Sequence, residues 1–417
     1  MTQREEQQPN WQTHTFAGRV RIEQLTGIRW FACLLVFLHH NTPGGQTPMW
    51  IVYFMNNGAC APAIFFVLSG FVLAITYADS LKRLDGKSTW DYVVARIARI
   101  YPLYLLMLLV ALAFTLQRGG NVGRMDFALQ LTTMQSWSPD HGAAYGVNPP
   151  GWTLSIEVFL YMCFPFLLLW LRPGRLATSK AVLTMVITVV SMLIMALAVY
   201  QTGTIDVPAH QAFSMHHLYR IPLFRLGDFI LGIAAAAIYL NLIRRPSRTP
   251  AAPAAGGPTG ATTPPKIRWA GPLSTVAVLV MVGLLLIPHF ANNPLGNDVA
   301  FAVPTVALIL GLGLATHTRL TRFMSLTWVV LLGELSYAFY LSHLVIQIYI
   351  TGFPLTNGFT WLSTLQFLAI FTFIVGVSYV LWRWFAQPSR GWVRRTLTRG
   401  PGSAGRSNAA PTSSVPS

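Results

Sequence analysis

A series of long apolar runs constrains this chain more than any other feature. They lie near residues 25–42, 56–78, 92–116, 151–171, 181–200, 221–243, 271–290, 299–316, 327–350 and 362–386. A helix needs about 20 mostly apolar residues to cross a bilayer, and several of these runs reach that length. Charged residues make up only 10% of the 417 positions, whereas soluble domains carry about a quarter. The sequence therefore predicts an all-α polytopic membrane protein with about ten transmembrane helices.

The basic residues predict how the chain is oriented. Its net charge of +16 would suggest nucleic-acid binding in a soluble protein, but Lys and Arg also gather on the cytoplasmic side of membrane proteins. With both termini inside, all but four of the 29 Lys and Arg residues fall on the inner side. The four exceptions are Arg118, Arg124, Arg220 and Arg225. We therefore expect cytoplasmic termini, a multi-pass position in the cytoplasmic (inner) membrane, and no nucleic acid among the partners.

Composition divides the chain into three parts. We expect a cytoplasmic N-terminal segment at 1–24, a membrane domain at 25–386, and a cytoplasmic, largely disordered tail at 387–417. Within the membrane domain, residues 244–268 are rich in Pro, Gly and Ala and predict a flexible inner linker. A long outer loop at 117–150 carries aromatic residues, so we expect it to fold back onto the membrane surface.

The first apolar run holds two ionisable residues on one face. Arg29 and His40 are eleven positions apart, almost three helical turns, and lie about 16 Å apart along the axis. Arg29 would sit near the inner surface and His40 deeper, which suits a donor whose charged end stays inside while its reactive carbonyl reaches the membrane interior. A neutral imidazole could there take a proton from a hydroxyl. Separately, Arg29 could be a snorkelling anchor and His40 an interfacial histidine.

A basic pair opens the third run. Arg96 and Arg99 are three positions apart and therefore neighbours on one helix face. Two guanidinium groups at an inner membrane surface suit a phosphate-bearing ligand. The inner-side bias of basic residues explains such a pair equally well.

An acidic residue lies inside the fourth run. Glu157 is about two turns from the outer surface, where a carboxylate must find a partner or be protonated. It could orient or charge-balance His40, or form a structural ion pair with Arg220 or Arg225.

Further polar residues interrupt the later runs. The ninth run carries Glu334 and His343, with Ser336 and Tyr337 between them, and either a functional or a structural role fits these groups. In the sixth run, Arg225 is three positions before Asp228, which favours a structural ion pair.

Six segments, in order, resemble acyltransferase family 3, the membrane O-acyltransferases of bacteria and some eukaryotes. They are LTGIRWFACLLVFLHHN (25–41), APAIFFVLSGFVLA (61–74), RIARIYPLY (96–104), MQSW with NPPGWTLSIEVFLY (134–161), IPLFRLGDFILG (221–232) and LGELSYAFYLSHLVI (332–346). The resemblance covers about residues 22 to 386. The first segment is similar to actinobacterial members that acylate secondary metabolites, and also to glycan-modifying relatives.

The resemblance implies an enzyme, an acyltransferase transferring groups other than amino-acyl groups. It implies His40 as the catalytic residue and Arg96 and Arg99, with Arg29, as donor-binding residues. Glu157 and Ser69 lie in its signature segments, and the later segments add His343, Tyr337, Ser336 and Arg225 as polar candidates. The expected co-substrate is cytoplasmic acyl-CoA, commonly acetyl-CoA, with no bound cofactor.

The expected function is O-acylation of a saccharide or a glycosylated metabolite within a lipid bilayer. No metal is expected, because Cys33, Cys60 and Cys163 all lie in apolar runs without metal-binding spacing. The alternative is a transporter or flippase of a lipid-linked glycan, which would also need buried charges. It predicts inverted repeats, of which the sequence shows no clear sign.

Overall fold

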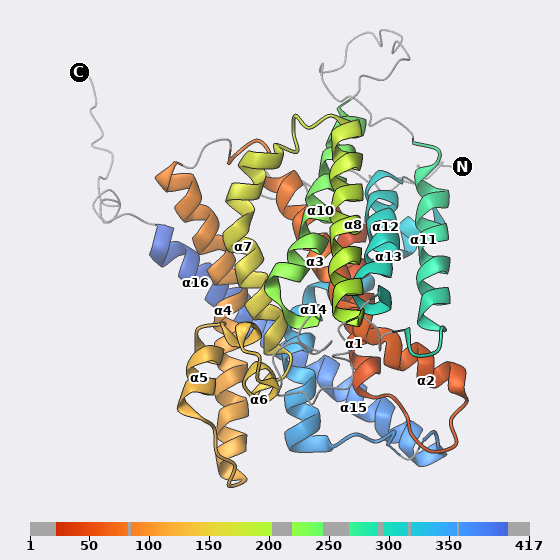
Figure 1. Ribbon diagram of the computed structural model, residues 1–417. Coiled ribbons are helices and arrows are strands. Elements are labelled where there is room, and N and C mark those ends of the chain that lie inside the picture. Colours follow the sequence, from red (N-terminus) through yellow and green to blue (C-terminus); the bar gives the residue numbers. More distant parts are fainter. Residues whose placement is uncertain are drawn as a thin grey trace, which may run out of the picture.

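The computed structural model describes residues 22–81, 85–201, 219–244, 267–290, 295–315, 318–356 and 358–398, and these residues form helices and no strand. Ten helices coincide with the ten predicted runs (Figure 1). They are α1 (Glu23–His40), α3 (Pro62–Tyr77), α4 (Gly86–Gln117), α7 (Gly151–Leu171), α8 (Thr178–Gln201), α10 (Pro222–Ile243), α11 (Ala270–Leu285), α12 (Ala302–Leu314), α14 (Thr327–Ile346) and α15 (Trp361–Val380).

Seven helical stretches of the described chain are long and apolar enough to cross a membrane. One of them joins α2 (Met49–Asn56), a 3-10 turn at Asn57–Cys60 and α3, so it begins earlier than the predicted start at 56. The helices α11 and α12 are apolar but shorter. Helix α1 is outside the set of seven, since its 18 residues include polar side chains such as Glu23, Arg29 and His40. A multi-pass helical membrane protein is confirmed, while ten spans and cytoplasmic termini stay predictions.

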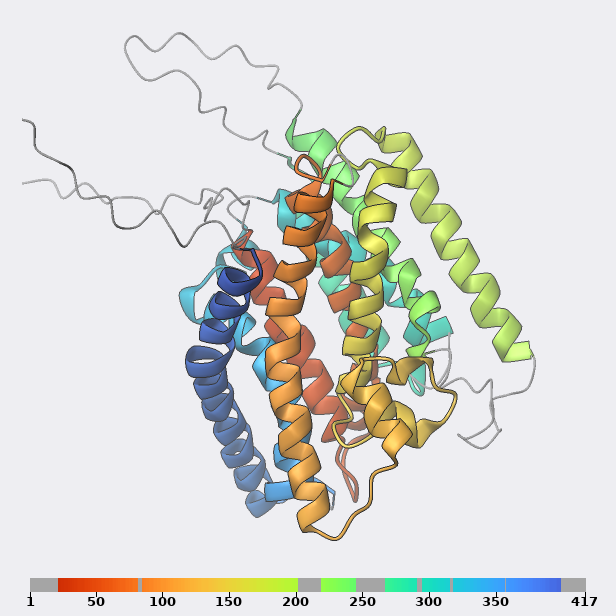
Figure 2. The ribbon, with the colours of Figure 1, turned by 90° about the vertical axis from the view of Figure 1, so that its left-hand side faces the viewer.

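The loop at 117–150 folds into a cap on the ends of α4 and α7 (Figure 2). It contains α5 (Arg124–Leu131), a 3-10 turn at Gln135–Trp137 and α6 (His141–Tyr145). The Tyr104 hydroxyl of α4 donates to the Gln130 carbonyl at 2.6 Å, and the Gln135 amide donates to the Gly151 carbonyl at 2.7 Å. The loop is therefore fixed to the helical bundle through buried backbone carbonyls.

Two helix pairs are in close contact at glycines. A Cβ atom on Gly232 of α10 would lie 2.0 Å from the Val67 carbonyl oxygen of α3, and one on Gly333 of α14 would lie 2.0 Å from the Thr26 carbonyl oxygen of α1. Small residues let membrane helices approach this closely, where apolar lipid provides no hydrophobic driving force between them. The α1–α14 pair matters most here, because both helices carry predicted site residues.

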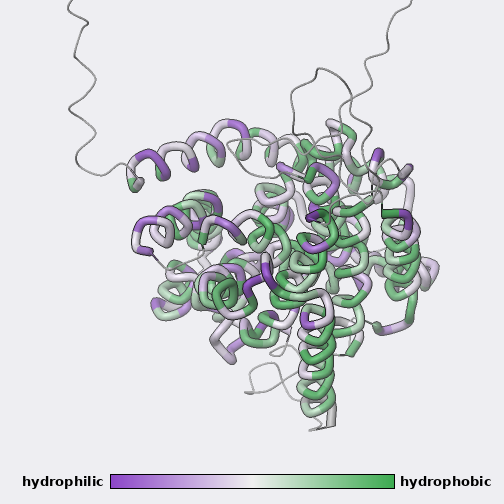
Figure 3. Tube along the Cα trace, turned by 90° about the horizontal axis from the view of Figure 1, so that it is seen from above, coloured by the Kyte–Doolittle hydropathy of each residue, from purple (hydrophilic) through white to green (hydrophobic). Residues whose placement is uncertain are grey.

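Helices at the periphery expose their apolar side chains. Helix α8, at the front of Figure 1, is almost entirely hydrophobic when the molecule is seen from above (Figure 3). Only 17% of the residues in its most apolar 18-residue segment are buried. The corresponding value for the stretch from Trp361 to Thr398 is 11%. These surfaces suit contact with lipid chains.

The predicted tail begins as a helix. Its first 12 residues form α16 (Gln387–Thr398), which follows α15 after a π-helical turn at Leu381–Ala386. The expectation of a largely disordered tail stays a prediction for the residues after Thr398. The helix packs along α4, and the Trp90 indole of α4 donates to the Leu397 carbonyl at 2.9 Å. The rest of the tail, most of the linker (245–266) and the first 21 residues lie outside the described residues.

Candidate functional site

A cavity of about 750 Å³ lies among α1, α3, α4, α7, α14 and α16. We call it the arginine cavity, because five arginines line it: Arg29, Arg96, Arg99, Arg390 and Arg394. Of the predicted site residues it also brings together Ser69, Glu157 and Tyr337. Its acidic lining residues are Glu157 and Glu334. The arrangement therefore favours an anionic ligand.

Arg96 lies at the end of the cavity formed by the last turn of α3, because its guanidinium carbon is 5.9 Å from the ring centroid of Tyr77. Thr76 and Tyr77, at the end of α3, line it there, together with the start of α1 and residues of α16. Toward the middle of the bundle its walls are uncharged, with Phe65, Leu103 and Tyr340. The α3 residues that line the cavity run from Pro62 to Tyr77, so the cavity extends about 22 Å along this helix at 1.5 Å per residue. A ligand with a charged head and a long uncharged arm fits this distribution.

Arg96 is held by aromatic rings. Its guanidinium carbon lies 5.9, 5.8 and 5.6 Å from the ring centroids of Tyr77, Tyr92 and Tyr161. The side chain is 8% exposed, and its Nε atom makes no hydrogen bond within the described structure. Cation–π contacts stabilise the charge without consuming its N–H donors. Arg96 therefore keeps donors for an anion that enters the cavity.

Glu157 lies in the arginine cavity. Its carboxylate accepts a hydrogen bond from Tyr161, one of the rings around Arg96, and it interacts electrostatically with Arg29 and Arg96. His40 lines a different cavity. The structure thus places Glu157 among the arginines, whereas the sequence analysis had offered it as a partner of His40.

His40 lies beside His343 at the other end of α1. Their ring centroids are 5.4 Å apart, and His40 also lines a second cavity of about 180 Å³ with Asn41, Thr42 and residues of the 353–356 loop. We call this cavity the histidine pocket. Asn41 and Gln347 exchange two side-chain hydrogen bonds next to it, at 2.6 and 3.3 Å. Among the described residues, no Asp, Glu, Lys or Arg lines the pocket.

The hydrogen bonds of His343 define its proton. Nδ1 lies 2.8 Å from the Tyr340 carbonyl oxygen, which can only accept, so Nδ1 carries the hydrogen of the neutral ring. Nε2 is then an acceptor, and it is buried without a partner within the described structure. An imidazole nitrogen in this state is able to take up a proton.

Tyr340 lies between the arginine cavity and the ring of His343. It lines the deep end of the arginine cavity, and its ring centroid lies 5.9 Å from that of His343. Its hydroxyl accepts a hydrogen bond from Thr153 of α7 at 3.1 Å. One aromatic side chain thus lies between the uncharged end of the large cavity and the histidine pair.

Three other candidates have structural hydrogen bonds. Ser336 donates to the Gly333 carbonyl at 2.8 Å and lines neither cavity, while Tyr337 lines the arginine cavity and donates to the Ile100 carbonyl at 2.6 Å. Arg225 forms a buried ion pair with Asp228 at 3.2 Å, as the sequence analysis favoured.

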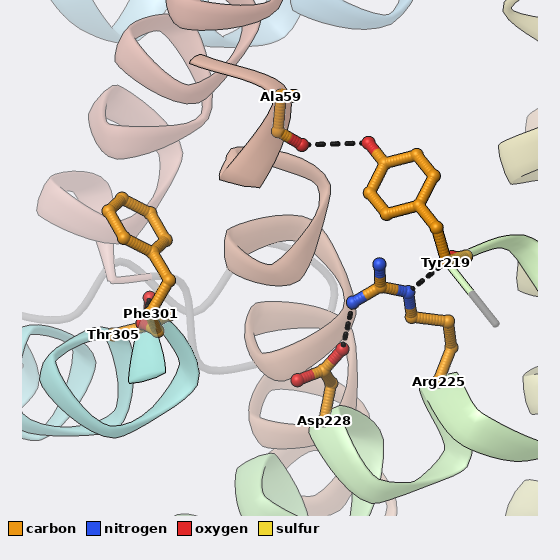
Figure 4. A network of polar contacts seen from close by, with 6 residues as sticks. All are labelled: Ala59, Tyr219, Arg225, Asp228, Phe301 and Thr305. Carbon is orange, nitrogen blue, oxygen red and sulfur yellow. Dashed lines mark hydrogen bonds and ion pairs between the residues drawn. The ribbon is translucent and has the colours of Figure 1, made fainter. Parts of the chain in front are cut away.

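Figure 4 shows the network around Arg225, and Arg225 lines neither cavity. Arg225 donates to the Tyr219 carbonyl at 2.8 Å, and Tyr219 donates to the Ala59 carbonyl at 2.7 Å. It therefore ties the start of α10 to the segment before α3. Thr305 and Phe301, also drawn, share a hydrogen bond within α12.

A comparison with protein families decides the class of the molecule. A family model described as an acyltransferase domain matches residues 22–383. The chain belongs to acyltransferase family 3. The family resemblance of the six segments is thereby confirmed, and so is the expectation of an enzyme that transfers acyl groups, which disfavours the transporter alternative.

Several known proteins are similar to this chain in sequence. Acyltransferase MdmB of Streptomyces mycarofaciens is 28% identical over 354 residues, which cover 81% of this chain and 82% of that protein. Nodulation protein 10 of Rhizobium leguminosarum bv. viciae is 28% identical over 36% of this chain and 46% of its own length. Protein 2 in picA locus of Rhizobium radiobacter is 30% identical over 41% of this chain and 93% of its own length. No solved structure matches significantly.

Proposed function

We propose that the chain is a membrane O-acyltransferase that moves an acyl group, with acetyl the first to test, from cytoplasmic acyl-CoA to a hydroxyl of a saccharide or glycosylated metabolite. The observation that carries the proposal is the separation of charge along α1. At one end is a large cavity with five arginines, and at the other are two histidines whose ring centroids are 5.4 Å apart. Acyl-CoA has the same division, with phosphates on the nucleotide and the reactive carbonyl at the end of an uncharged arm.

Arg29, Arg96 and Arg99 would bind the phosphates. None of the three makes a salt bridge within the described residues, so their charges remain for a ligand. Glu157 would offset part of this positive charge and, through Tyr161, keep the aromatic ring in place beside Arg96. Ser69 and Tyr337 would line the path of the arm.

The chemistry would take place at the histidine pair. The acceptor hydroxyl enters the histidine pocket, and His40, supported by His343, takes its proton as the oxygen attacks the thioester carbonyl. The carbon–sulfur bond breaks, the ester forms, and the imidazolium returns the proton to the departing thiolate of CoA. Such general-base catalysis contributes about 10²- to 10⁴-fold. The acyl end reaches the pair past Tyr340.

The experiment measures CoA release and transfer of label from radiolabelled acetyl-CoA by purified protein in lipid, with extracted cell glycans and metabolites as acceptors. Wild type should release CoA and label a product, and His40→Ala should do neither. His141→Ala, which changes a histidine in the cap at α6, should behave as wild type. Folded wild-type protein that releases no CoA with acetyl or longer acyl donors, or full activity in His40→Ala, would overturn the proposal.

A further inference from the structure

The helix α16 contributes to the mouth of the arginine cavity. Gln387, Arg390, Gly391 and Arg394 all line it, and they recur three and four positions apart, which places them on one helical face. The two arginines lie at the charged end, with the start of α1 and the end of α3. The sequence analysis had assigned this segment to a disordered tail.

The helix is positioned as a wall by packing. It lies along α4, the helix that carries Arg96 and Arg99, and the hydrogen bond from Trp90 to the Leu397 carbonyl fixes its last turn. Its sequence has three arginines and no acidic residue. Two basic pairs, one from α4 and one from α16, therefore line the same cavity.

We propose that Arg390 and Arg394 of α16 bind the nucleotide phosphates of the acyl donor at the cavity mouth, while Arg96 and Arg99 act deeper. The inference rests on the proposed function and adds a second phosphate-binding element to it. A guanidinium has five N–H donors, so each arginine can hold a protein neighbour and a phosphate oxygen together. Acyl-CoA has phosphates at two places on its nucleotide, which matches two separate basic pairs.

The same two arginines could instead bind the phosphates of lipid headgroups. The exposed side chain of Trp392 on this helix would suit such a membrane contact. The two sources differ in one testable respect. An acyl-pantetheine donor keeps the thioester and the arm but lacks the nucleotide. Loss of a nucleotide contact raises the KM for acyl-CoA alone, whereas loss of a lipid contact changes the KM for both donors equally.

The experiment therefore compares steady-state kinetics of Arg394→Gln and Arg390→Gln with both donors in bilayers of fixed composition. Each variant should raise the KM for acyl-CoA about fivefold, leave kcat within twofold, and leave the KM for acyl-pantetheine unchanged. Arg395→Gln is the matched control, because Arg395 belongs to the same helix but does not line the cavity.

Two results would overturn this assignment. One is a KM for acyl-CoA equal to that of wild type in both variants, and the other is an equal rise with both donors. Failure of the proposed function gives a different result, because wild-type protein would then transfer no acyl group from either donor.

Discussion

The arginine cavity and the histidine pocket both include residues of α1, but the side chains that line them differ in charge. The first is large, is lined by five arginines, and balances them with two carboxylates and a set of tyrosine rings. The second is about a quarter of that volume and is lined by His40, Asn41 and two threonines together with the apolar Phe353 and Leu355. The difference teaches that the two ends of α1 offer different environments, one rich in charged side chains and one with the histidines to which we assign proton transfer. Each prediction below tests whether this division is real.

The largest effect should come from the histidine pair. His40→Ala and His343→Ala should each lower kcat by about 10²- to 10⁴-fold, because each removes part of the proton acceptor. If the two rings act as one unit, the double variant should lose no more than the worse single variant. Product formation from labelled donor measures kcat, and the KM for acyl-CoA should stay near the wild-type value. Independent, multiplying losses would show that the rings do not share one step.

The next largest effect should come from Arg96 in the arginine cavity. Arg96→Gln should raise the KM for acyl-CoA about 10- to 100-fold, because a hydrogen bond to a charged group contributes about 1.5–3 kcal/mol. Arg118→Gln is the matched control. Arg118 also lies over a tyrosine ring, that of Tyr349 at 5.5 Å, but is at the far end of α4 outside the cavity. A change in the KM of the acceptor instead of the donor would reverse the roles of the two cavities.

A glycine contact allows both ends to be disturbed at once. In Gly333→Ala the new Cβ atom would meet the Thr26 carbonyl oxygen at 2.0 Å, so α1 and α14 must separate. Donor binding and turnover should then weaken together, lowering kcat/KM on the order of tenfold. Gly376→Ala on α15, where the space around the Cβ atom is open, should change neither quantity. If only one of the two kinetic constants changes, the two cavities are less rigidly joined than α1 suggests.

The smallest effect should come from the hydroxyl of Tyr340. Tyr340→Phe keeps the ring but removes the hydroxyl that accepts from Thr153. The loss of one neutral hydrogen bond is about 1 kcal/mol, so we expect roughly a fivefold change in kcat/KM for acyl-CoA. Thr153→Val should lower kcat/KM at least as much, because it also removes the hydrogen bond from Thr153 to the Pro150 carbonyl, and the double variant should add little. Clearly additive losses would indicate that the two residues act separately.

Much of the fold could be predicted from local sequence, because runs of apolar residues need no partner to be identified. The ten helices and the shared face of Arg29 and His40 follow from length and helical spacing alone. Rotation of one helix against another could not be predicted. Depth in the membrane suggested Glu157 as a neighbour of His40, but the facing of α7 sets its carboxylate among the arginines.

The C-terminal helix illustrates a second limit. Pro388, Gly391 and a high content of arginine make α16 look like a solvated tail, and local preference alone would not favour a helix there. Packing on α4 stabilises it, including the bond from Trp90, which is 307 positions away in the sequence. Such a contact leaves no trace in the pattern of either segment. The pairing of His40 with His343 was missed for the same reason.

The arginine cavity draws its walls from the first and the last helices of the described chain, from Ile22 of α1's entry to Arg394 of α16. A ribosome releases the chain from the N-terminus at about 5–20 residues per second, so α16 is made after every other wall of the cavity. A nascent protein that already contains α1 and α14 would still lack the residues of α16 that line the arginine cavity. Under the role proposed for Arg390 and Arg394, a chain without α16 would bind the acyl donor more weakly than one that contains it.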